Sequence, residues 1–217
     1  MDYFLDSNII IGYSICIDKW HESSKNVFNK GKTIYWSPLV KQESLYKIKK
    51  LIDKYNFIFK EIEENIEEGI VQKEYFFNQV RNLELIENHF QLAEILWTIG
   101  RWYEEVHSEE LLNFLEELTG ILYNTSQKRY FYCTEYLVEH VRKNKYEKIL
   151  NSFNSLKNEN FTIIHYPDDE IILDAHDLAN TGKDIEFITS DKKLLEFKKD
   201  IMRLTKINKM TFIDDIN

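Results

Sequence analysis

Cysteine, proline and glycine are scarce in this chain of 217 residues, which contains 2, 2 and 6 of them, respectively. The two cysteines, Cys16 and Cys133, are far apart and have no neighbouring cysteine, which argues against a disulfide framework or a thiolate zinc site. No apolar run reaches the ~18–20 residues that a membrane-spanning helix needs. The opening segment MDYFLDSN has no basic stretch, so we expect no secretory signal. These absences predict a soluble, cytoplasmic protein that does not enter a membrane.

The negative charge of the chain is confined to one internal segment. The net charge is −9, and residues 51–120 contain 5 basic and 16 acidic residues, a balance of −11. The other 147 residues contain 23 basic and 21 acidic ones, a balance of +2. The two flanks can therefore present a basic groove to a nucleic acid, although the whole chain is acidic.

A long central stretch of the chain is predicted to be helical. No proline lies between Pro38 and Pro167, and proline is poorly tolerated inside helices. Gly69, Gly100 and Gly120 are the expected breaks between helices. Apolar residues recur at helical spacing, as in the series Ile62, Ile66, Ile70 and the series Leu111, Leu115, Leu118, Leu122.

The two ends of the chain alternate between short strands and helices. This alternation predicts an α/β fold, with a parallel sheet sandwiched by helices. We expect one domain with a core formed by residues 1–55 and 160–217 and a large helical insertion at residues 56–159. The predicted strands are residues 3–5, 33–36, 161–166, 185–189 and 211–213, and the predicted helices are residues 9–15, 40–51, 168–180 and 191–199.

Four acids lie where predicted strands turn into helices. Asp6 and Asp191 lie at the ends of two predicted strands, while Glu43 and Asp174 lie on the helices after two other strands. Ligands of an open parallel sheet bind beyond the carboxyl ends of its strands, so these side chains can converge. Two like charges about 6 Å apart repel by roughly 3 kcal/mol at an effective dielectric constant near 20. Mg²⁺ or Mn²⁺, which prefer oxygen ligands, would offset this repulsion.

Four short segments resemble motifs of the PIN-domain nucleases, in the order of that family. They are residues 5–10 (LDSNII), 37–43 (SPLVKQE), 173–179 (LDAHDLA) and 187–192 (FITSDK). The resemblance covers residues 1–55 and 160–217. It implies a PIN-like fold and a Mg²⁺- or Mn²⁺-dependent endoribonuclease that hydrolyses phosphodiester bonds of RNA with two metal ions. The residues that match the family's catalytic metal ligands are Asp6, Glu43, Asp174 and Asp191.

Residues beside these four acids have candidate supporting roles. By the same resemblance, Asn8 would orient the first acid and Ser190 would lie beside the fourth. Asp177 is a candidate auxiliary ligand one turn after Asp174, although a solvated helix acid is the favoured interpretation. Lys192 and Lys193 stand where the family often has a further acid, and they are candidate phosphate-binding residues.

Several candidates also have purely structural interpretations. Asp6 and Asp191 could cap helices, and Glu43 could be a surface glutamate. His176 is expected to be a structural histidine. Residues 128–132 interleave cations with aromatic side chains, as RNA-binding surfaces do. The favoured alternative is an amphipathic helix that buries Phe131, Val138 and Val141.

Several partners remain open at this point. The chain could be the toxin of a toxin–antitoxin pair that an inhibitory protein holds inactive, or a nuclease that needs a helper protein. It could also form a homo-oligomer. A different class of function is a non-catalytic scaffold of the same fold, which binds a protein partner through its helical insertion.

Overall fold

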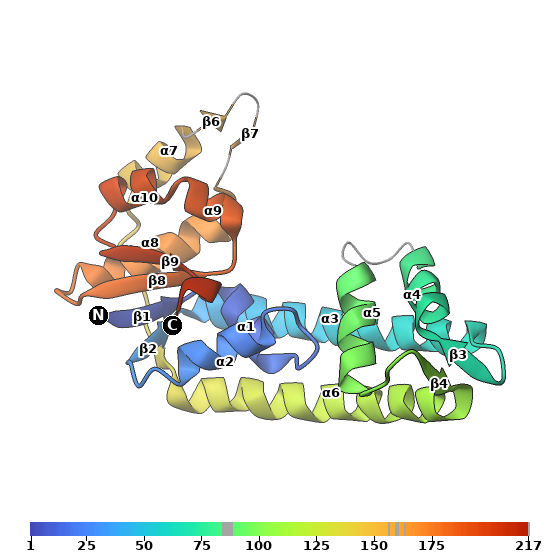
Figure 1. Ribbon diagram of the computed structural model, residues 1–217. Coiled ribbons are helices and arrows are strands. Elements are labelled where there is room, and N and C mark those ends of the chain that lie inside the picture. Colours follow the sequence, from blue (N-terminus) through green and yellow to red (C-terminus); the bar gives the residue numbers. More distant parts are fainter. Residues whose placement is uncertain (84–88, 156, 159–160, 163, 217) are drawn as a thin grey trace.

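The computed structural model describes residues 1–83, 89–155, 157–158, 161–162 and 164–216. A five-stranded parallel sheet in the order β5-β2-β1-β8-β9 forms the centre of the fold and is flanked by helices (Figure 1). This confirms the predicted α/β class. The strands of the sheet are β1 (Asp2–Leu5), β2 (Ile34–Trp36), β5 (Val138–Glu139), β8 (Ile185–Thr189) and β9 (Lys209–Phe212).

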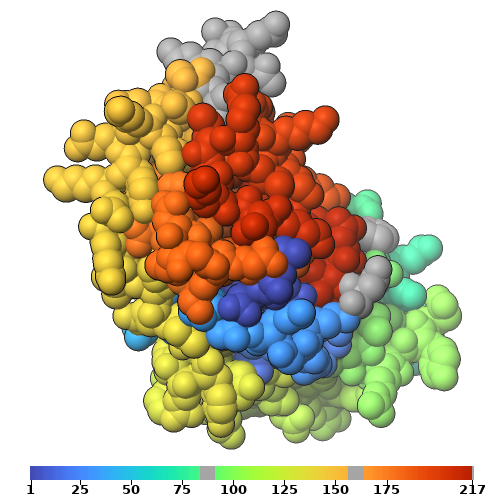
Figure 2. All heavy atoms as spheres, turned by 90° about the vertical axis from the view of Figure 1, so that its left-hand side faces the viewer, coloured from blue at the N-terminus to red at the C-terminus, as the bar shows by residue number. Residues whose placement is uncertain are grey.

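The sheet is built around β1, which pairs with β2 on one side and with β8 on the other. Phe4 lies opposite Phe187 in the register, and their rings stack with centroids 6.2 Å apart. Figure 2 views the end of the molecule at which the chain begins, and there the dark-blue N-terminal residues lie between light-blue and orange-to-red segments. The carboxyl ends of the strands lie at the other edge of the sheet, toward the middle of the molecule, where β1 turns into α1 (Figure 1).

Helices follow the strands at both ends of the chain, as predicted. The longest of them begins where Ser37 accepts a hydrogen bond from the backbone N–H of Val40 and Pro38 takes the first helical position. The helix expected at residues 191–199 is divided in two at Phe197. The helices that follow the strands are α1 (Ser7–Ser14), α2 (His21–Phe28), α3 (Pro38–Asn65), α8 (Asp168–Ala179), α9 (Lys192–Glu196) and α10 (Lys198–Leu204), and η1 (Ile213–Asp215) is a short 3₁₀ turn.

The third predicted strand, residues 161–166, is confirmed only at residues 161–162, and it does not join the parallel sheet. β7 (Phe161–Thr162) pairs antiparallel with β6 (Lys157–Asn158) in a separate hairpin, and residues 164–166 are not extended in a ladder. Residue 163 lies outside the described residues. The position beside β2 belongs instead to β5, which pairs Glu139 with Trp36. Because β5 has only two residues and both are exposed, its hydropathy pattern could not reveal it.

The end of the central segment also differs from the amphipathic helix that we expected. Val138 and Val141 are 45% and 60% exposed, and Phe131 is 61% exposed, so none of the three is buried. Val138 lies in β5, and Val141 lies in the connection that leads to α7 (Glu147–Ser155). Only Phe131 lies on a helix, α6 (Ser108–Tyr136). The local pattern was overridden by the pairing of this segment with β2.

A helical lobe extends from the sheet on two long helices, α3 and α6, which run side by side (Figure 1). It consists of α4 (Lys73–Asn82), α5 (His89–Ile99) and the hairpin of β3 (Ile70–Gln72) and β4 (Glu105–His107), together with the ends of α3 and α6 that they cover. Gly69 and Gly100 lie at breaks, as predicted. The expected break at Gly120 is wrong, because α6 continues through it.

Two apolar clusters stabilise these parts of the molecule. The first surrounds the sheet and includes Trp36 and Phe187, but also Cys133 and Phe153 from the expected insertion. The second fills the helical lobe and reaches back to Ile11 in α1. α3 crosses residue 55 without interruption, so residues 56–159 share helices and core packing with the rest of the chain. In the described ranges, no helix combines the length and the apolar character needed to cross a membrane.

Gly12 permits the close approach of α1 and α2. A Cβ atom at this position would lie 2.6 Å from Ser24 Oγ and 3.1 Å from Trp20 Cβ. We therefore expect Gly12→Ala to lower the free energy of unfolding by about 1–3 kcal/mol. Gly120→Ala is the matched control, because its Cβ would meet nothing within 4 Å. It should raise stability by about 0.5–1 kcal/mol. Urea denaturation measures the free energy of unfolding of both variants. Equal changes in the two variants would contradict the close approach of α1 and α2 at Gly12.

Candidate functional site

Asp6 lies at the carboxyl end of the central strand. Its side chain is 3% exposed and accepts a 2.7 Å hydrogen bond from the hydroxyl of Thr189, at the end of the neighbouring strand β8. Asp6 occupies the N-cap position of α1, yet its carboxylate makes no capping hydrogen bond. Burial raises the pKa of Asp6, the Thr189 hydroxyl opposes this, and the charge of Glu43 raises it further. The capping interpretation of Asp6 is therefore wrong.

Glu43 lies on the second turn of α3, close to Asp6. Its side chain is 11% exposed, and Lys47 forms a 2.7 Å ion pair with Oε1 one turn further along the helix. The other oxygen, Oε2, is buried without a hydrogen-bond partner. Buried carboxylate oxygens are rarely left unpaired, so this atom suits a ligand that the protein itself does not supply. Glu43 is not an ordinary surface glutamate.

Asp168, the first residue of α8, joins these acids and is the site residue that the sequence analysis missed. Burial raises its pKa to about 7, and the charges of Asp6, Asp191 and Glu43 add to this effect, whereas Lys47 opposes it. Asp168 therefore lies close enough to the other three carboxylates for their charges to act on it. The available signal was an acid directly after Pro167, in the first turn of a predicted helix.

Asp174, which we expected in this group, lies in a different environment. Its Oδ1 is 3.3 Å from Nε of Arg142, and Ser37 donates a hydrogen bond to it. Burial raises its pKa, and the charges that act on it are those of Arg142, Glu170 and His140. Asp174 follows Asp168 by six residues, or about 240° around a helix, so the two side chains leave α8 in different directions. The structure brings Asp168, rather than Asp174, together with the other three acids.

Asp177 is neither solvated nor free to serve as a ligand. It is 4% exposed and accepts four hydrogen bonds: from His140 Nε2 (3.0 Å), the Lys143 backbone N–H (3.2 Å), Asn144 Nδ2 (3.0 Å) and the Tyr146 hydroxyl (2.7 Å). Burial alone would raise its pKa, but these bonds outweigh burial and lower it. Asp177 therefore anchors the connection between β5 and α7 to α8.

His176, on the same helix, has the structural role that we expected. It is buried, and its Nδ1 accepts a 2.8 Å hydrogen bond from the backbone N–H of Lys206. Its Nε2 lies 2.9 Å from Asn180 Nδ2. Both ring nitrogens are thus engaged by neighbouring segments, and burial lowers the pKa of the imidazole.

Asp191 combines the capping role with membership of the acid cluster. Its Oδ1 accepts hydrogen bonds from the backbone N–H groups of Lys193 (2.8 Å) and Leu194 (3.2 Å), which starts α9. Its charge also raises the pKa of Asp168. A groove of about 1170 Å³ runs past Asp191. The candidate supporting residues Asn8, Ser190, Lys192 and Lys193 all line this groove.

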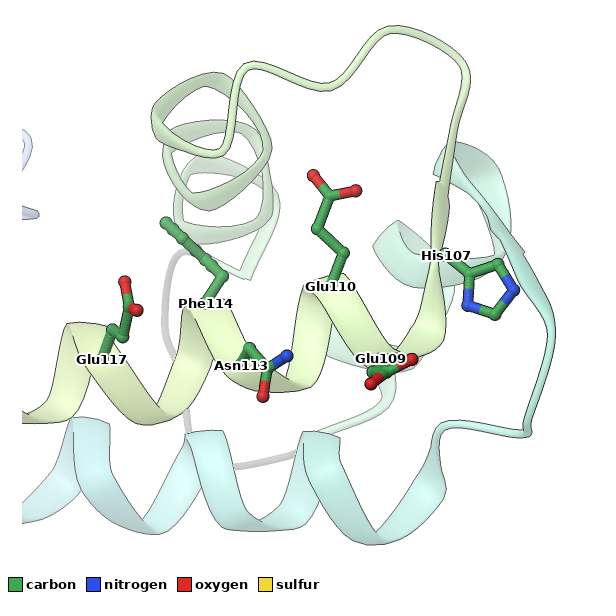
Figure 3. Close-up of a pocket in the computed structure, with 6 residues that line it drawn as sticks. All are labelled: His107, Glu109, Glu110, Asn113, Phe114 and Glu117. Carbon is green, nitrogen blue, oxygen red and sulfur yellow. The ribbon is translucent and has the colours of Figure 1, made fainter.

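A second acidic pocket, of about 420 Å³, lies at the start of α6 in the helical lobe (Figure 3). Glu109, Glu110 and Glu117 line it together with His107. Figure 3 shows these side chains spread along the helix rather than directed at one point. Glu110 also accepts a 2.7 Å hydrogen bond from the indole N–H of Trp102, so it stabilises the lobe.

The acids at the sheet edge suit a hard divalent cation by their chemistry. All the donors are carboxylate oxygens, one of them is buried and unpaired, and three of the charges repel that of Asp168. Across the described part of the chain, no three His, Cys, Asp or Glu side chains are already grouped so that they could hold a metal ion. Binding would therefore require side-chain adjustment, including release of Glu43 by Lys47.

No known protein family, curated protein or solved structure matches this chain. The chemistry and geometry of the acid cluster therefore carry the functional conclusion.

Proposed function

We propose that this protein is a metal-dependent endoribonuclease of the type that its motifs resemble, the PIN-domain nucleases. Asp6, Glu43, Asp168 and Asp191 would bind Mg²⁺ or Mn²⁺. The observation that supports this proposal is the gathering of four carboxylates from separate elements, close enough that their charges help to raise the pKa of Asp168 to about 7. Folding alone gains nothing from such repulsion, whereas a divalent cation offsets it.

The remaining residues of the site orient these acids. The Thr189 hydroxyl holds one oxygen of Asp6, and the start of α9 holds one oxygen of Asp191. Lys192 and Lys193 line the adjoining groove, where they can neutralise substrate phosphates. A bound divalent cation would supply the Lewis acidity that lowers the pKa of a water molecule and stabilises the leaving oxygen.

Cleavage of an end-labelled single-stranded RNA in the presence of Mn²⁺ tests the proposal. Asp6→Asn should reduce the rate by on the order of 100-fold or more, because metal ions supply several kcal/mol of transition-state stabilisation. Asp214→Asn is a matched control. Asp214 lines the same groove but accepts its hydrogen bond from Ser23, at 2.7 Å, and should leave the rate unchanged. Equal rates in wild type and Asp6→Asn would refute the proposal.

A second candidate function is that of a scaffold that binds a protein partner, whether an inhibitor, a helper or a second copy. A groove of about 880 Å³ between α3 and α6 favours it, because exposed Leu45, Tyr123 and Phe131 contribute apolar surface to its walls. A folded wild-type protein that neither binds Mn²⁺ nor cleaves RNA would favour this function over catalysis.

A further inference from the structure

We propose that Lys50 and Lys54 of α3, together with Lys193 of α9, form a phosphate-binding track that leads a single-stranded RNA from the acid cluster toward the helical lobe. This inference rests on the proposed nuclease function. It adds the path of the substrate across the surface and the residues that define this path.

The lysines of α3 share one face of the helix. Lys47, Lys50 and Lys54 are three and four residues apart, so their side chains project in similar directions over about 10 Å of helix. All three line the groove that also contains Ser190 and Asp191. The track therefore begins at the acid cluster, where Lys47 pairs with Glu43, and continues along α3 away from it.

Three lysines of the groove make neither an ion pair nor a ring contact in the described part of the chain, while the other three make one of these contacts. Lys47 forms the ion pair with Glu43, Lys192 lies 5.4 Å from the centroid of the Phe212 ring, and Lys19 lies 5.1 Å from that of Trp20. Among the ion pairs that the described ranges contain, none involves Lys50, Lys54 or Lys193. Three ammonium groups without an ion pair lie along this groove. Its six lysines outnumber the carboxylates that also line it, those of Asp18, Asp191 and Asp214, so the groove matches a ligand with repeated negative charges.

The surrounding charge confines such a ligand to the groove. Residues 51–120, which include the helical lobe, contain 16 acidic residues against 5 basic ones, and Lys54 is one of these five. Phosphates are therefore attracted along the lysines and repelled by the lobe beyond them. An acidic peptide would gain the same attraction, but it carries no phosphodiester on which the proposed nuclease site could act. The observations favour RNA.

Binding of a short fluorescent RNA, measured by anisotropy in the Asp6→Asn background, tests the track. Lys50→Gln/Lys54→Gln should weaken binding about tenfold near 0.1 M salt and reduce the slope of log K against log salt by about 1.4. The matched control is Lys49→Gln/Lys128→Gln, which removes the same charge from the groove between α3 and α6. This control should change the affinity by less than about twofold.

Equal losses in the two double variants would overturn the track, and so would an absence of RNA binding in the Asp6→Asn background. Polyglutamate serves as a competitor. If it displaces the RNA with equal affinity and itself no longer binds to Lys50→Gln/Lys54→Gln, the track is assigned to an acidic protein instead of RNA. The melting temperature in Mn²⁺ separates this inference from the proposed function. If Mn²⁺ raises the melting temperature of wild type but Lys50→Gln/Lys54→Gln does not weaken RNA binding, the track alone is refuted. If Mn²⁺ does not raise the melting temperature of wild type, the metal site is refuted.

Discussion

Asp168→Asn is expected to abolish stabilisation of the protein by Mn²⁺ and, at pH 8, to raise the melting temperature of the metal-free protein. The two effects have one cause. Burial, with added repulsion from Asp6, Asp191 and Glu43, raises the pKa of Asp168 from 3.8 to about 7. The charged carboxylate is therefore unfavourable in the folded, metal-free protein. Asparagine removes that charge, and it also removes a ligand that the cation needs.

The expected size of the stabilisation follows from this pKa. A carboxyl group with a raised pKa favours the folded state below its unfolded pKa, near 3.8, and this contribution is lost as the pH rises through about 7. Metal-free wild type should therefore lose stability between about pH 4 and pH 7, with little further loss from this group above that. At pH 8 the substitution should recover about 2–4 kcal/mol, or on the order of 10 °C in melting temperature. Thermal denaturation of wild type and Asp168→Asn in the presence of a chelator, across this pH range and up to pH 8, measures the difference in stability.

Asp174→Asn is the comparison that shows whether Asp168 or Asp174 belongs to the metal site. It should weaken the contact with Arg142 and lower the melting temperature, while stabilisation by Mn²⁺ remains. Calorimetric titration of Mn²⁺ into both variants provides a second readout. Loss of binding in Asp174→Asn together with retention in Asp168→Asn would show that the family motif, rather than the observed cluster, identifies the ligand.

Asp177→Asn is expected to destabilise the protein by about 3–5 kcal/mol, without any effect on Mn²⁺ binding. Asp177 is buried and accepts hydrogen bonds from four donors, and an amide NH₂ group would face some of these donors. For a chain of this size the melting temperature should fall by on the order of 10 °C. Denaturation in guanidinium chloride measures the change in the free energy of unfolding.

The pH dependence of this effect has the opposite sign to that of Asp168. Because the pKa of Asp177 is lowered, its contribution is present above the unfolded value of 3.8 and is lost as the pH falls through the folded value. The difference between wild type and variant should therefore shrink in acid. Asp200→Asn is a control, since its ion pair with Arg203 is exposed and should contribute less than about 1 kcal/mol. If Asp177→Asn also lowers the free energy of unfolding by less than about 1 kcal/mol, the connection after β5 is held by other contacts.

Local signals in the sequence were sufficient to place three of the four clustered acids. Asp6 directly follows a short apolar strand, Asp191 lies two residues after another, and Glu43 follows a Ser-Pro pair that starts a helix. Each of these signals acts within a few residues, so the chain encodes it without reference to the rest of the fold. The α/β class follows from the same alternation of strands and helices at the two ends.

The choice between Asp168 and Asp174 was decided by tertiary structure. Both lie on α8, and which of them faces the cluster depends on how that helix is rotated against the sheet. Buried Ala175 and Leu178 set this rotation through the core, and Arg142 then pairs with Asp174 from a segment over thirty residues earlier. The two-residue strand β5 was decided in the same way, because its position depends on backbone pairing with β2 and not on its own side chains. Contacts between distant segments leave no periodic pattern in the sequence, and only the folded chain reveals them.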